Sequence, residues 1–311
     1  MTVRALLFPG QGSQAVGMGK ELAHAHPAAA AVFARADEAL GLPLTRRCFE
    51  GPPEALTATA IAQPALLTHA VASLAAIEAK HGPVVFHGAA GHSLGEWTAL
   101  VVAGALDFDD AVRLVHLRGR LMQDAVPVGV GAMAAALGLD GAKVADLCAA
   151  ASVGDEIVVP ATFNGGGNIV VSGHRAAVER FLAGASAAGA RALPVEVSAP
   201  FHSPLMAPVE EPLRSALDRV AVRAPRVRVR STARDAWLET AAAVRDALVA
   251  QLVAPVLWET CVGALAASGA DEAWVLGSGK SLARMVQRLR LPWRVRAVGG
   301  PEDVEDEGSE A

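Results

Sequence analysis

The sequence contains no tyrosine and only three cysteines among its 311 residues. Cys48, Cys148 and Cys261 are odd in number and far apart, which fits neither a disulfide framework nor a metal site. We interpret them as small buried hydrophobic residues. The nine histidines form no His-Glu-x-x-His motif or Cys/His cluster, so no metal is expected. Because the chain has no tyrosine, a tyrosine hydroxyl is excluded as a catalytic acid or base.

Charge is also sparse. Charged residues make up 19% of the chain and the formal net charge is −5, which gives no general electrostatic footprint for nucleic acid. No uncharged apolar run reaches about 18 residues, so no membrane span is expected. The N-terminus lacks the basic region, long apolar core and cleavage site of a signal peptide, which predicts a cytoplasmic protein.

Apolar residues make up 52% of the chain, enough for a sizeable core in one large domain or two ordinary ones. A predicted buried strand at 3–8 runs into a glycine-rich turn at 9–14, and open α/β sheets bind ligands at such strand ends. The turn resembles a dinucleotide fingerprint, but no acidic residue lies about 20 positions later at the end of a following strand, so we reject that interpretation. Helical patterns cover about 15–40 and 64–81, with Pro64 in the first turn of the second.

The most informative stretch is Gly-x-Ser-x-Gly at 91–95. It follows the apolar run 84–86 and precedes a helical segment from 97, the strand, turn and helix context of a nucleophile elbow. The two glycines permit a strained turn that exposes the Ser93 hydroxyl at a helix N-terminus, where backbone N–H groups face developing negative charge. An ordinary glycine-rich turn is the alternative that the motif alone leaves open.

An amphipathic helix is predicted at 108–125, with Asp107 as its N-cap. Arg118 interrupts its apolar stripe, where a guanidinium costs several kcal/mol unless an anion meets it. In the functional interpretation, the two-pronged guanidinium of Arg118 holds a substrate carboxylate. An internal salt bridge or a side chain that reaches solvent is the alternative.

Short elements between 127 and 198 follow the order β-α-β-β-α-β, which predicts a ferredoxin-like subdomain. Its expected elements lie at 131–137, 140–151, 156–160, 168–172, 175–189 and 191–197. A turn at 164–167 would join its central strands. The larger α/β domain is then discontinuous, comprising 1–126 and 199–299, and an acidic, disordered tail is predicted at 300–311.

The chain returns to the larger domain at 198–204. Ser203 followed by Pro204 predicts a helix over 204–220, with His202 in the loop immediately before it. A surface-loop histidine without a role is the alternative. Further elements are predicted at 226–230, 239–253, 257–269, 272–276, 280–290 and 293–298. Residues 279–281 resemble a phosphate loop, but Trp274 stands where an earlier glycine is required, so we reject it.

Eight separated stretches resemble the acyl-CoA:acyl carrier protein transacylases, specifically the malonyl-transferring enzymes of fatty acid synthesis, which are related to polyketide synthase acyltransferase domains. They occur in the family's order over residues 5–290, which is more specific than any single motif. The matching stretches are 8–14 (Phe-Pro-Gly-Gln-Gly-Ser-Gln), 63–65 (Gln-Pro-Ala), 91–96 (Gly-His-Ser-Leu-Gly-Glu), 118–123 (Arg-Gly-x-x-Met-Gln), 131–133 (Gly-Ala-Met), 171–173 (Val-Ser-Gly), 200–206 (Pro-Phe-His-Ser-Pro-Leu-Met) and 251–256 (Gln-Leu-x-x-Pro-Val).

The resemblance implies an α/β-hydrolase-like large domain with a parallel sheet core, and a Ser–His catalytic pair. Ser93 would be the nucleophile and His202 its general base, later the acid. The family orients this histidine with a backbone carbonyl, here that of Gln251, rather than with an aspartate. The oxyanion hole would be the backbone N–H groups of Gln11 and Leu94.

Substrate recognition is implied for five further side chains. Arg118 would grip the free carboxylate of malonyl, and Gln63 would line the same pocket. In related polyketide enzymes a bulky phenylalanine before the active histidine accompanies malonyl rather than methylmalonyl, so Phe201 favours malonyl. Asn164 is expected at the small-domain lip of the cleft. Trp97 stands where tyrosine, phenylalanine or a smaller residue is more usual, and we expect it to narrow or reshape the acyl pocket.

The implied reaction moves malonyl from malonyl-CoA to the phosphopantetheine thiol of an acyl carrier protein through malonyl-Ser93, without a metal or bound cofactor. The family is often monomeric. Carrier proteins are acidic, so a basic docking face is expected from the arginine-rich segments 219–234 and 280–296, although solvated surface charge explains each residue equally well. The alternatives are a discrete acyltransferase serving a polyketide synthase in trans, an acyl-thioester hydrolase, and a homologue that only binds.

Overall fold

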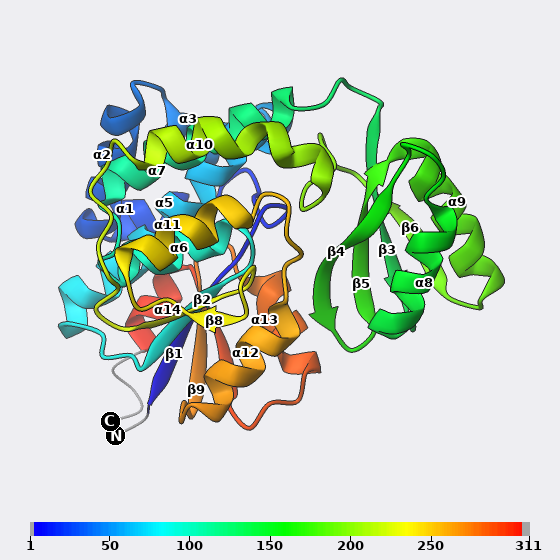
Figure 1. Cartoon of the computed structure of the whole chain (residues 1–311). Helices are drawn as coiled ribbons and strands as arrows, with labels where there is room; N and C mark the ends of the chain where they lie inside the picture. Colours follow the sequence, from blue (N-terminus) through cyan, green and yellow to red (C-terminus); the bar gives the residue numbers. More distant parts are fainter. Residues whose placement is uncertain (1–2, 307–311) are drawn as a thin grey trace.

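The computed structural model describes residues 3–306 and contains two sheets (Figure 1). The larger sheet has the strand order β10-β9-β1-β2-β7-β8. All its pairings are parallel except that of β7 with β8. The strands are β1 (Arg4–Phe8), β2 (Gly88–Gly91), β7 (Arg228–Ser231), β8 (Ala236–Trp237), β9 (Glu272–Leu276) and β10 (Arg294–Val298).

Alternation along β1 divides the large unit into two cores, one on each face of the sheet. Leu6 and Phe8 belong to one core, which is shared with helices α1 to α7, α10 and α11. Ala5 and Leu7 belong to the other, which is shared with α12 and α13. These helices are α1 (Lys20–Ala25), α2 (Pro27–Leu40), α3 (Leu44–Glu50), α4 (Pro53–Thr57), α5 (Thr59–His81), α6 (Leu94–Val102), α7 (Phe108–Asp124), α10 (Glu210–Leu217), α11 (Ala241–Ala250), α12 (Trp258–Ala267) and α13 (Lys280–Arg288).

The strand before the serine lies closer to it than the sequence suggested. The apolar run 84–86 is not a strand, and Val85 is 81% exposed. The strand is instead the Gly-Ala-Ala-Gly segment β2, which is paired with β1 on one side and β7 on the other and is buried throughout. Small residues suit this position because α6 and α12 contact the strand. In the parallel register Phe8 lies beside Gly91, so the loop after β1 meets the turn after β2.

Helix α5 begins at Thr59, five residues before the predicted start, and therefore places Pro64 inside the helix rather than in its first turn. Proline has no N–H to donate to the Ala60 carbonyl. The Nδ1 of His116 on α7 satisfies that carbonyl instead, at 2.7 Å. Among the described residues, α5 is the one helix long and apolar enough to cross a membrane, and 83% of that stretch is buried inside the protein. It is the core helix of the large unit.

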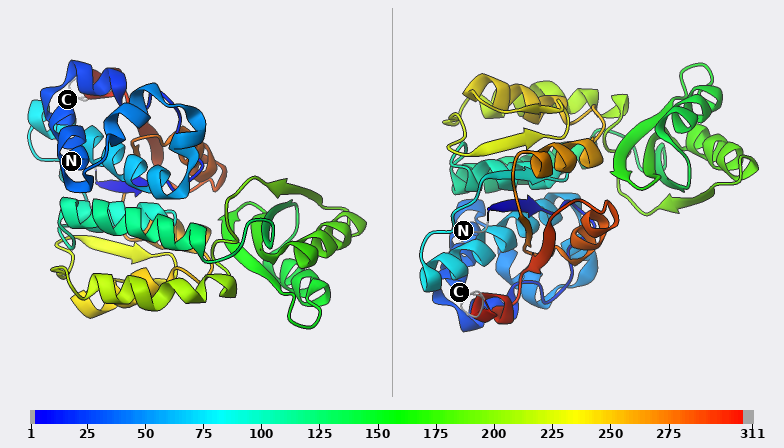
Figure 2. Two further views of the ribbon diagram at one scale, coloured as in Figure 1. Left: turned by 90° about the horizontal axis from the view of Figure 1, so that it is seen from above. Right: turned by 90° about the horizontal axis from the view of Figure 1, so that it is seen from below.

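The smaller sheet is antiparallel, with the order β4-β5-β3-β6, and stands beside the large unit together with its two helices, as Figure 2 shows from two further sides. The predicted β-α-β-β-α-β order is observed. Residues 164 and 165 are the last two of β4 instead of the start of a turn, and β4 is an edge strand rather than a central one. The elements are β3 (Gly131–Leu137), α8 (Gly141–Ala151), β4 (Val158–Gly165), β5 (Asn168–His174), α9 (Arg175–Ala187) and β6 (Arg191–Val195).

Prolines account for two further differences from the predicted helices. The segment 15–40 is two helices, because the chain is extended at His26 and restarts with Pro27 at the first turn of α2. The predicted helix 204–220 is a 3-10 helix, η1 (Pro204–Val209), followed by α10, with Pro208 inside the 3-10 segment. The short helices α3 and α4 were not predicted.

The prediction of a disordered tail from residue 300 is wrong for its described part. Residues Pro301–Glu305 form helix α14, in which Val304 is fully buried. The carboxylate of Asp303 accepts the N–H groups of Gly299 and Gly300 at 2.8 Å each. His81 at the end of α5 lies 2.7 Å from the Val304 carbonyl. The acidic residues at 302 and 303 lie at a helix N-terminus, where their charge is favourable. Residues 307–311 lie outside the described part.

Candidate active site

Ser93 stands on a sharp turn between β2 and α6. Its backbone has φ 51° and ψ −109°, a left-handed conformation that is strained for a residue with a side chain. A Cβ on Gly91 would lie 1.8 Å from the Gly95 carbonyl carbon, and a Cβ on Gly95 would lie 2.1 Å from the Phe8 oxygen. Both glycines of the motif are therefore required by close backbone contact, and the expected order of strand, turn and helix is present, with β2 as the strand in place of 84–86.

His202 reaches this serine from a distant part of the chain. The Ser93 hydroxyl lies 2.8 Å from Nε2 of His202, and Nδ1 of His202 lies 2.9 Å from the Gln251 carbonyl. With Nδ1–H donating to that carbonyl, Nε2 accepts from the serine. His202 also has a positive φ, 58°, and is buried. The alternative of a surface-loop histidine does not fit this geometry.

The environment of His202 keeps the imidazole neutral. Burial lowers its pKa from 6.5 to about 3, and the positive charge of Arg118 adds to this effect. A neutral imidazole can accept the Ser93 proton, so the group is in the form that a general base requires at neutral pH.

This environment predicts how Ser93 acylation depends on pH. Because the active form of His202 is the deprotonated one and its pKa is depressed, activity is lost only as pH falls toward about 3. We expect the pre-steady-state acylation rate to stay constant from about pH 8 down to about pH 5. Circular dichroism at each pH would verify folding. A rate that halves near pH 6.5 in folded protein would contradict this assignment.

Arg118 is buried on α7 beside the serine. Its Nη1 donates to Oε1 of Gln63 at 2.8 Å, and its Nη2 donates to Oε1 of Gln251 at 2.9 Å and to the Ser93 hydroxyl at 3.5 Å. Burial lowers the arginine pKa to about 10, partly opposed by Glu96, so the group stays charged at neutral pH. Within residues 3–306 no carboxylate forms a salt bridge with it. A guanidinium held by two neutral amides is poised for an anion.

A cavity of about 480 Å³ unites these groups. Its apolar wall includes Met122, Met133, Val170 and Val195. The predicted site residues that line it are Gln11, Gln63, Ser93, Leu94, Arg118, Asn164, Phe201 and His202.

Two of the predicted site residues lie behind this surface. Gln251 is fully buried and supports the site without lining the cavity. Its Nε2 donates to the Ser93 carbonyl at 3.0 Å, its backbone carbonyl contacts His202, and its Oε1 accepts from Arg118. Trp97 is fully buried in the core that contains Phe8 and Leu100, and it is not among the described residues that line the cavity. Helix α6 turns it inward, so Trp97 does not shape the pocket by direct contact.

Two backbone N–H groups are available beside the serine. A Cβ on Gly10 would lie 2.6 Å from the His92 oxygen, so the loop after β1 packs directly on the elbow. This places Gln11 next to Leu94, the first residue of α6, and both line the cavity. Among the described residues, neither backbone N–H has a hydrogen-bond acceptor. Free N–H groups at a helix N-terminus and an adjacent loop are suited to an oxyanion.

Sequence reasoning missed two groups next to the serine, the half-buried His92 and the fully buried Glu96. Nε2 of His92 lies 2.9 Å from Oδ1 of Asn164, which ties the elbow to β4 of the smaller sheet. Oε2 of Glu96 accepts the Thr232 N–H at 2.9 Å and its hydroxyl at 2.8 Å, and burial raises the Glu96 pKa. Both residues belong to the motif at 91–96, which was the available signal. Their partners are 72 and 136 positions away and carry no local pattern.

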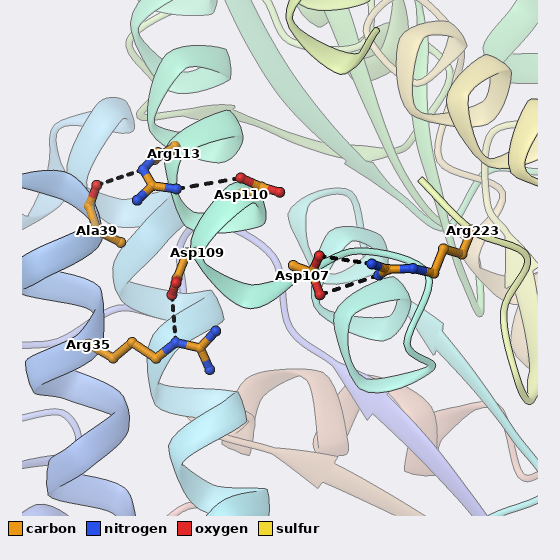
Figure 3. Close-up of polar contacts among 7 residues, drawn as sticks. All are labelled: Arg35, Ala39, Asp107, Asp109, Asp110, Arg113 and Arg223. Atoms are coloured by element: carbon orange, nitrogen blue, oxygen red, sulfur yellow. Dashed lines mark hydrogen bonds and ion pairs between the residues drawn. The ribbon is translucent and has the colours of Figure 1, made fainter. Parts of the chain in front are cut away.

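The first arginine-rich segment is largely engaged in contacts with the protein itself. Figure 3 shows Arg223 holding both carboxylate oxygens of Asp107, at 3.3 and 3.2 Å. Asp107 therefore makes no side-chain N-cap bond, contrary to expectation. Arg230 pairs with Asp235 at 2.6 Å, and Arg228 lies over the Trp237 ring.

In the described part of the chain, no group of three or more His, Cys, Asp or Glu side chains could hold a metal.

Known proteins resemble this chain over nearly its whole length. Residues 5–276 match the acyl transferase domain model. A malonyl CoA-acyl carrier protein transacylase from Escherichia coli (strain K12) is 46% identical over 293 residues, covering 93% of each chain. The protein of the same name from Bacillus subtilis (strain 168) is 42% identical over 306 residues, covering 98% of this chain and 96% of its own.

Solved structures give the same result for the fold. The malonyl CoA-acyl carrier protein transacylase of Coxiella burnetii matches with a TM-score of 0.95 at 38% identity, covering 98% of this chain and 96% of its own. A malonyl-transacylase solved in complex with its type II polyketide synthase acyl-carrier protein matches with a TM-score of 0.95 at 38% identity, covering 100% of both chains. With these matches and the site geometry, the chain belongs to the acyl transferase family, among the malonyl CoA-acyl carrier protein transacylases.

Proposed function

We propose that this protein transfers a malonyl group from malonyl-CoA to the phosphopantetheine thiol of an acyl carrier protein in fatty acid synthesis. One observation carries the proposal: the buried, charged fork of Arg118 lies 3.5 Å from the Ser93 hydroxyl, in the same cavity. A cation at that distance suits an acyl group with a second, ionised end. The names of the relatives agree with this substrate and acceptor.

The reaction proceeds in two half-reactions. His202 takes the proton of Ser93 as the hydroxyl attacks the thioester carbonyl, and the N–H groups of Gln11 and Leu94 receive the oxyanion. Collapse of this intermediate breaks the C–S bond, and the histidine returns its proton to the leaving CoA thiolate. In the second half-reaction His202 deprotonates the carrier thiol, which attacks malonyl-Ser93 and restores the free serine.

The remaining expectations follow from the same assignment. We infer an α/β-hydrolase-like large domain formed by 1–126 and 199–299, around the inserted subdomain 127–198; the elbow after a central parallel strand supports this. No bound cofactor or metal enters the reaction. We expect a cytoplasmic monomer that binds neither nucleic acid nor membrane.

Helix α13 is the better placed of the two basic segments for docking an acidic carrier protein. Met285 on this helix lines the cavity, while Lys280, Arg284 and Arg288 are exposed. By contrast, the parallel pairing of Arg228 with Gly88 places the start of β7 at the amino ends of the strands, whereas Ser93 follows the carboxyl end of β2. A carrier protein at α13 would bring its arm directly to the cavity.

A polyketide carrier protein is the second candidate acceptor. It is favoured by one finding, the similarity to the malonyl-transacylase solved with a type II polyketide synthase carrier protein. The chemistry at Ser93 is the same for both. Relative kcat/KM values with holo carrier proteins of the two pathways would distinguish them.

The experiment that tests the function follows the acyl group by mass. Malonyl-, methylmalonyl- and acetyl-CoA compete for the enzyme, and intact-protein mass is measured before and after holo carrier protein is added. We expect a malonyl adduct on Ser93 that moves to the carrier thiol. An adduct lost equally fast without carrier protein would indicate an acyl-thioester hydrolase. Persistent absence of an adduct and of transfer would leave a protein that only binds.

The choice between malonyl and methylmalonyl is expected to depend on Phe201. This side chain lines the cavity immediately before His202. One methyl group is worth about 1–3 kcal/mol of discrimination in a pocket. Phe201→Ser should therefore raise methylmalonyl-CoA use relative to malonyl-CoA by about tenfold. Competition between the two thioesters, read by adduct mass, measures this shift. An unchanged product ratio with normal malonyl transfer would refute the role of Phe201.

A further inference from the structure

The hydroxyl of Thr59 joins two segments that border the cavity and lie far apart in the sequence. Thr59 is the first residue of α5 and is fully buried. Its Oγ1 lies 3.0 Å from Nε2 of Gln11 and 2.7 Å from the Ser198 hydroxyl. Because the side-chain nitrogen of Gln11, Nε2, can only donate, the Thr59 hydroxyl accepts that bond and has its own proton free for Ser198. One hydroxyl therefore contacts the loop after β1 and the segment that leads to His202.

The position of Thr59 is itself tightly determined. At Gly119 helix α7 approaches α5 closely. A Cβ added to Gly119 would lie 2.6 Å from both the backbone carbonyl oxygen of Thr59 and Cα of Ala60. The next carbonyl along, that of Ala60, accepts from His116. Two contacts with α7, the helix that carries Arg118, thus fix the start of α5. Thr59 therefore has a fixed position from which its hydroxyl can hold the side chain of a loop residue, Gln11, by a hydrogen bond.

The loop at Gln11 depends on such an attachment. Residues 9–15 belong to no helix or strand, and Gly12 has φ 96°. The Gln11 amide contacts Thr59, and the Gly12 N–H donates to Oε1 of Gln14 at 2.8 Å. An oxyanion donor must be held close to its productive position, since small misplacements cost large factors in rate.

We propose that Thr59 is a positioning residue for the transfer reaction: its hydroxyl holds the Gln11 side chain, and so sets the backbone N–H of Gln11 that receives the oxyanion. The inference rests on the proposed function, in which Gln11 supplies one of the two oxyanion donors. Thr59 itself does not line the cavity among the described residues, so it acts through Gln11 and Ser198 rather than on the substrate.

Two substitutions at the same position separate the hydroxyl from the methyl group. Thr59→Val keeps the shape and removes the hydroxyl, whereas Thr59→Ser keeps the hydroxyl and removes the methyl. We expect Thr59→Val to lower kcat for malonyl transfer by about tenfold, with KM for malonyl-CoA changed less than about twofold. Thr59→Ser should stay within about threefold of the unchanged protein. A merely structural role of the methyl group would reverse this order.

A matched control lies nine positions along the same helix. Thr68 is also fully buried on α5, and its hydroxyl has no partner within the described chain. Thr68→Val makes the same chemical change and should leave kcat unaltered. The double variant Gln11→Leu with Thr59→Val should be no slower than the slower of the two single variants, because each substitution removes the same Gln11–Thr59 contact. Additive losses would overturn the link through Gln11.

The outcomes also separate this inference from the proposed function. If unaltered protein forms malonyl-Ser93 and transfers it while Thr59→Val keeps full kcat, the positioning role is wrong and the function stands. If Thr59→Val and Thr68→Val lose kcat equally, the effect is general to the helix and the inference fails. If the unaltered protein forms no adduct with any thioester, the proposed function itself fails, and the positioning role fails with it.

Discussion

Ser93→Ala is expected to lower kcat for malonyl transfer by about 10⁶-fold, the scale on which removing a nucleophile acts in comparable Ser–His enzymes. The reason is geometric. His202 lies 2.8 Å from the hydroxyl, and the elbow holds that hydroxyl at the N-terminus of α6, where the described residues offer no acceptor to the Leu94 N–H. Without it no covalent intermediate can form. Intact-protein mass after incubation with malonyl-CoA should show no adduct, and transfer to holo carrier protein should fall to background.

A second buried serine supplies the control. Ser172 on β5 is fully buried, and its hydroxyl has no partner in the part of the chain that the structure describes. Ser172→Ala should bind and transfer malonyl normally. Binding of malonyl-CoA to the Ser93→Ala protein, measured by calorimetry, should remain close to that of the unaltered protein, since Arg118 and the cavity are intact. Transfer retained by Ser93→Ala would refute the covalent mechanism.

Much of the fold was predictable because local pattern and tertiary environment agree. Residues 5–8 and 273–276 are continuous apolar runs, as strands buried on both faces of a parallel sheet require. The errors arise where tertiary contacts override local signals. Small residues 88–91 form a strand because helices press on both sides, and α5 accommodates Pro64 because His116 satisfies the carbonyl that proline leaves free.

The site divides in the same way. Ser93 is visible from its flanking glycines, and Arg118 from the apolar stripe that it interrupts. In the sequence, His202 shows only a position in a loop, and its assignment as the general base came from the resemblance alone. The two contacts that support this assignment, to Ser93 and to the Gln251 carbonyl, join residues 109 and 49 positions apart. No periodicity encodes such distances. Trp97 was misplaced for a related reason: its position directly after the motif does not reveal which way α6 turns its side chain.

Arg118→Ala is expected to lower the preference for malonyl-CoA over acetyl-CoA by roughly 10- to 100-fold, the range for hydrogen bonds to charged groups. The guanidinium now rests on the amide oxygens of Gln63 and Gln251, at 2.8 and 2.9 Å. A malonyl carboxylate offers the charged acceptor that these amides lack, whereas an acetyl group leaves the buried cation as it was. The ratio of kcat/KM values for the two thioesters measures the effect.

Arg113 provides the matched control on the same helix. It lies five positions earlier on α7 and is half exposed, and it donates to the Ala39 carbonyl at 2.9 Å and to Asp110 at 3.4 Å on the surface (Figure 3). Arg113→Ala removes the same charge from α7 without touching the cavity, so its malonyl preference should be unaltered. Equal loss in both variants would mean that the net charge of α7 sets the preference. An unchanged ratio of kcat/KM values for malonyl-CoA and acetyl-CoA in Arg118→Ala would show that the enzyme selects malonyl without the guanidinium. Arg118 would then have no role in binding the malonyl carboxylate.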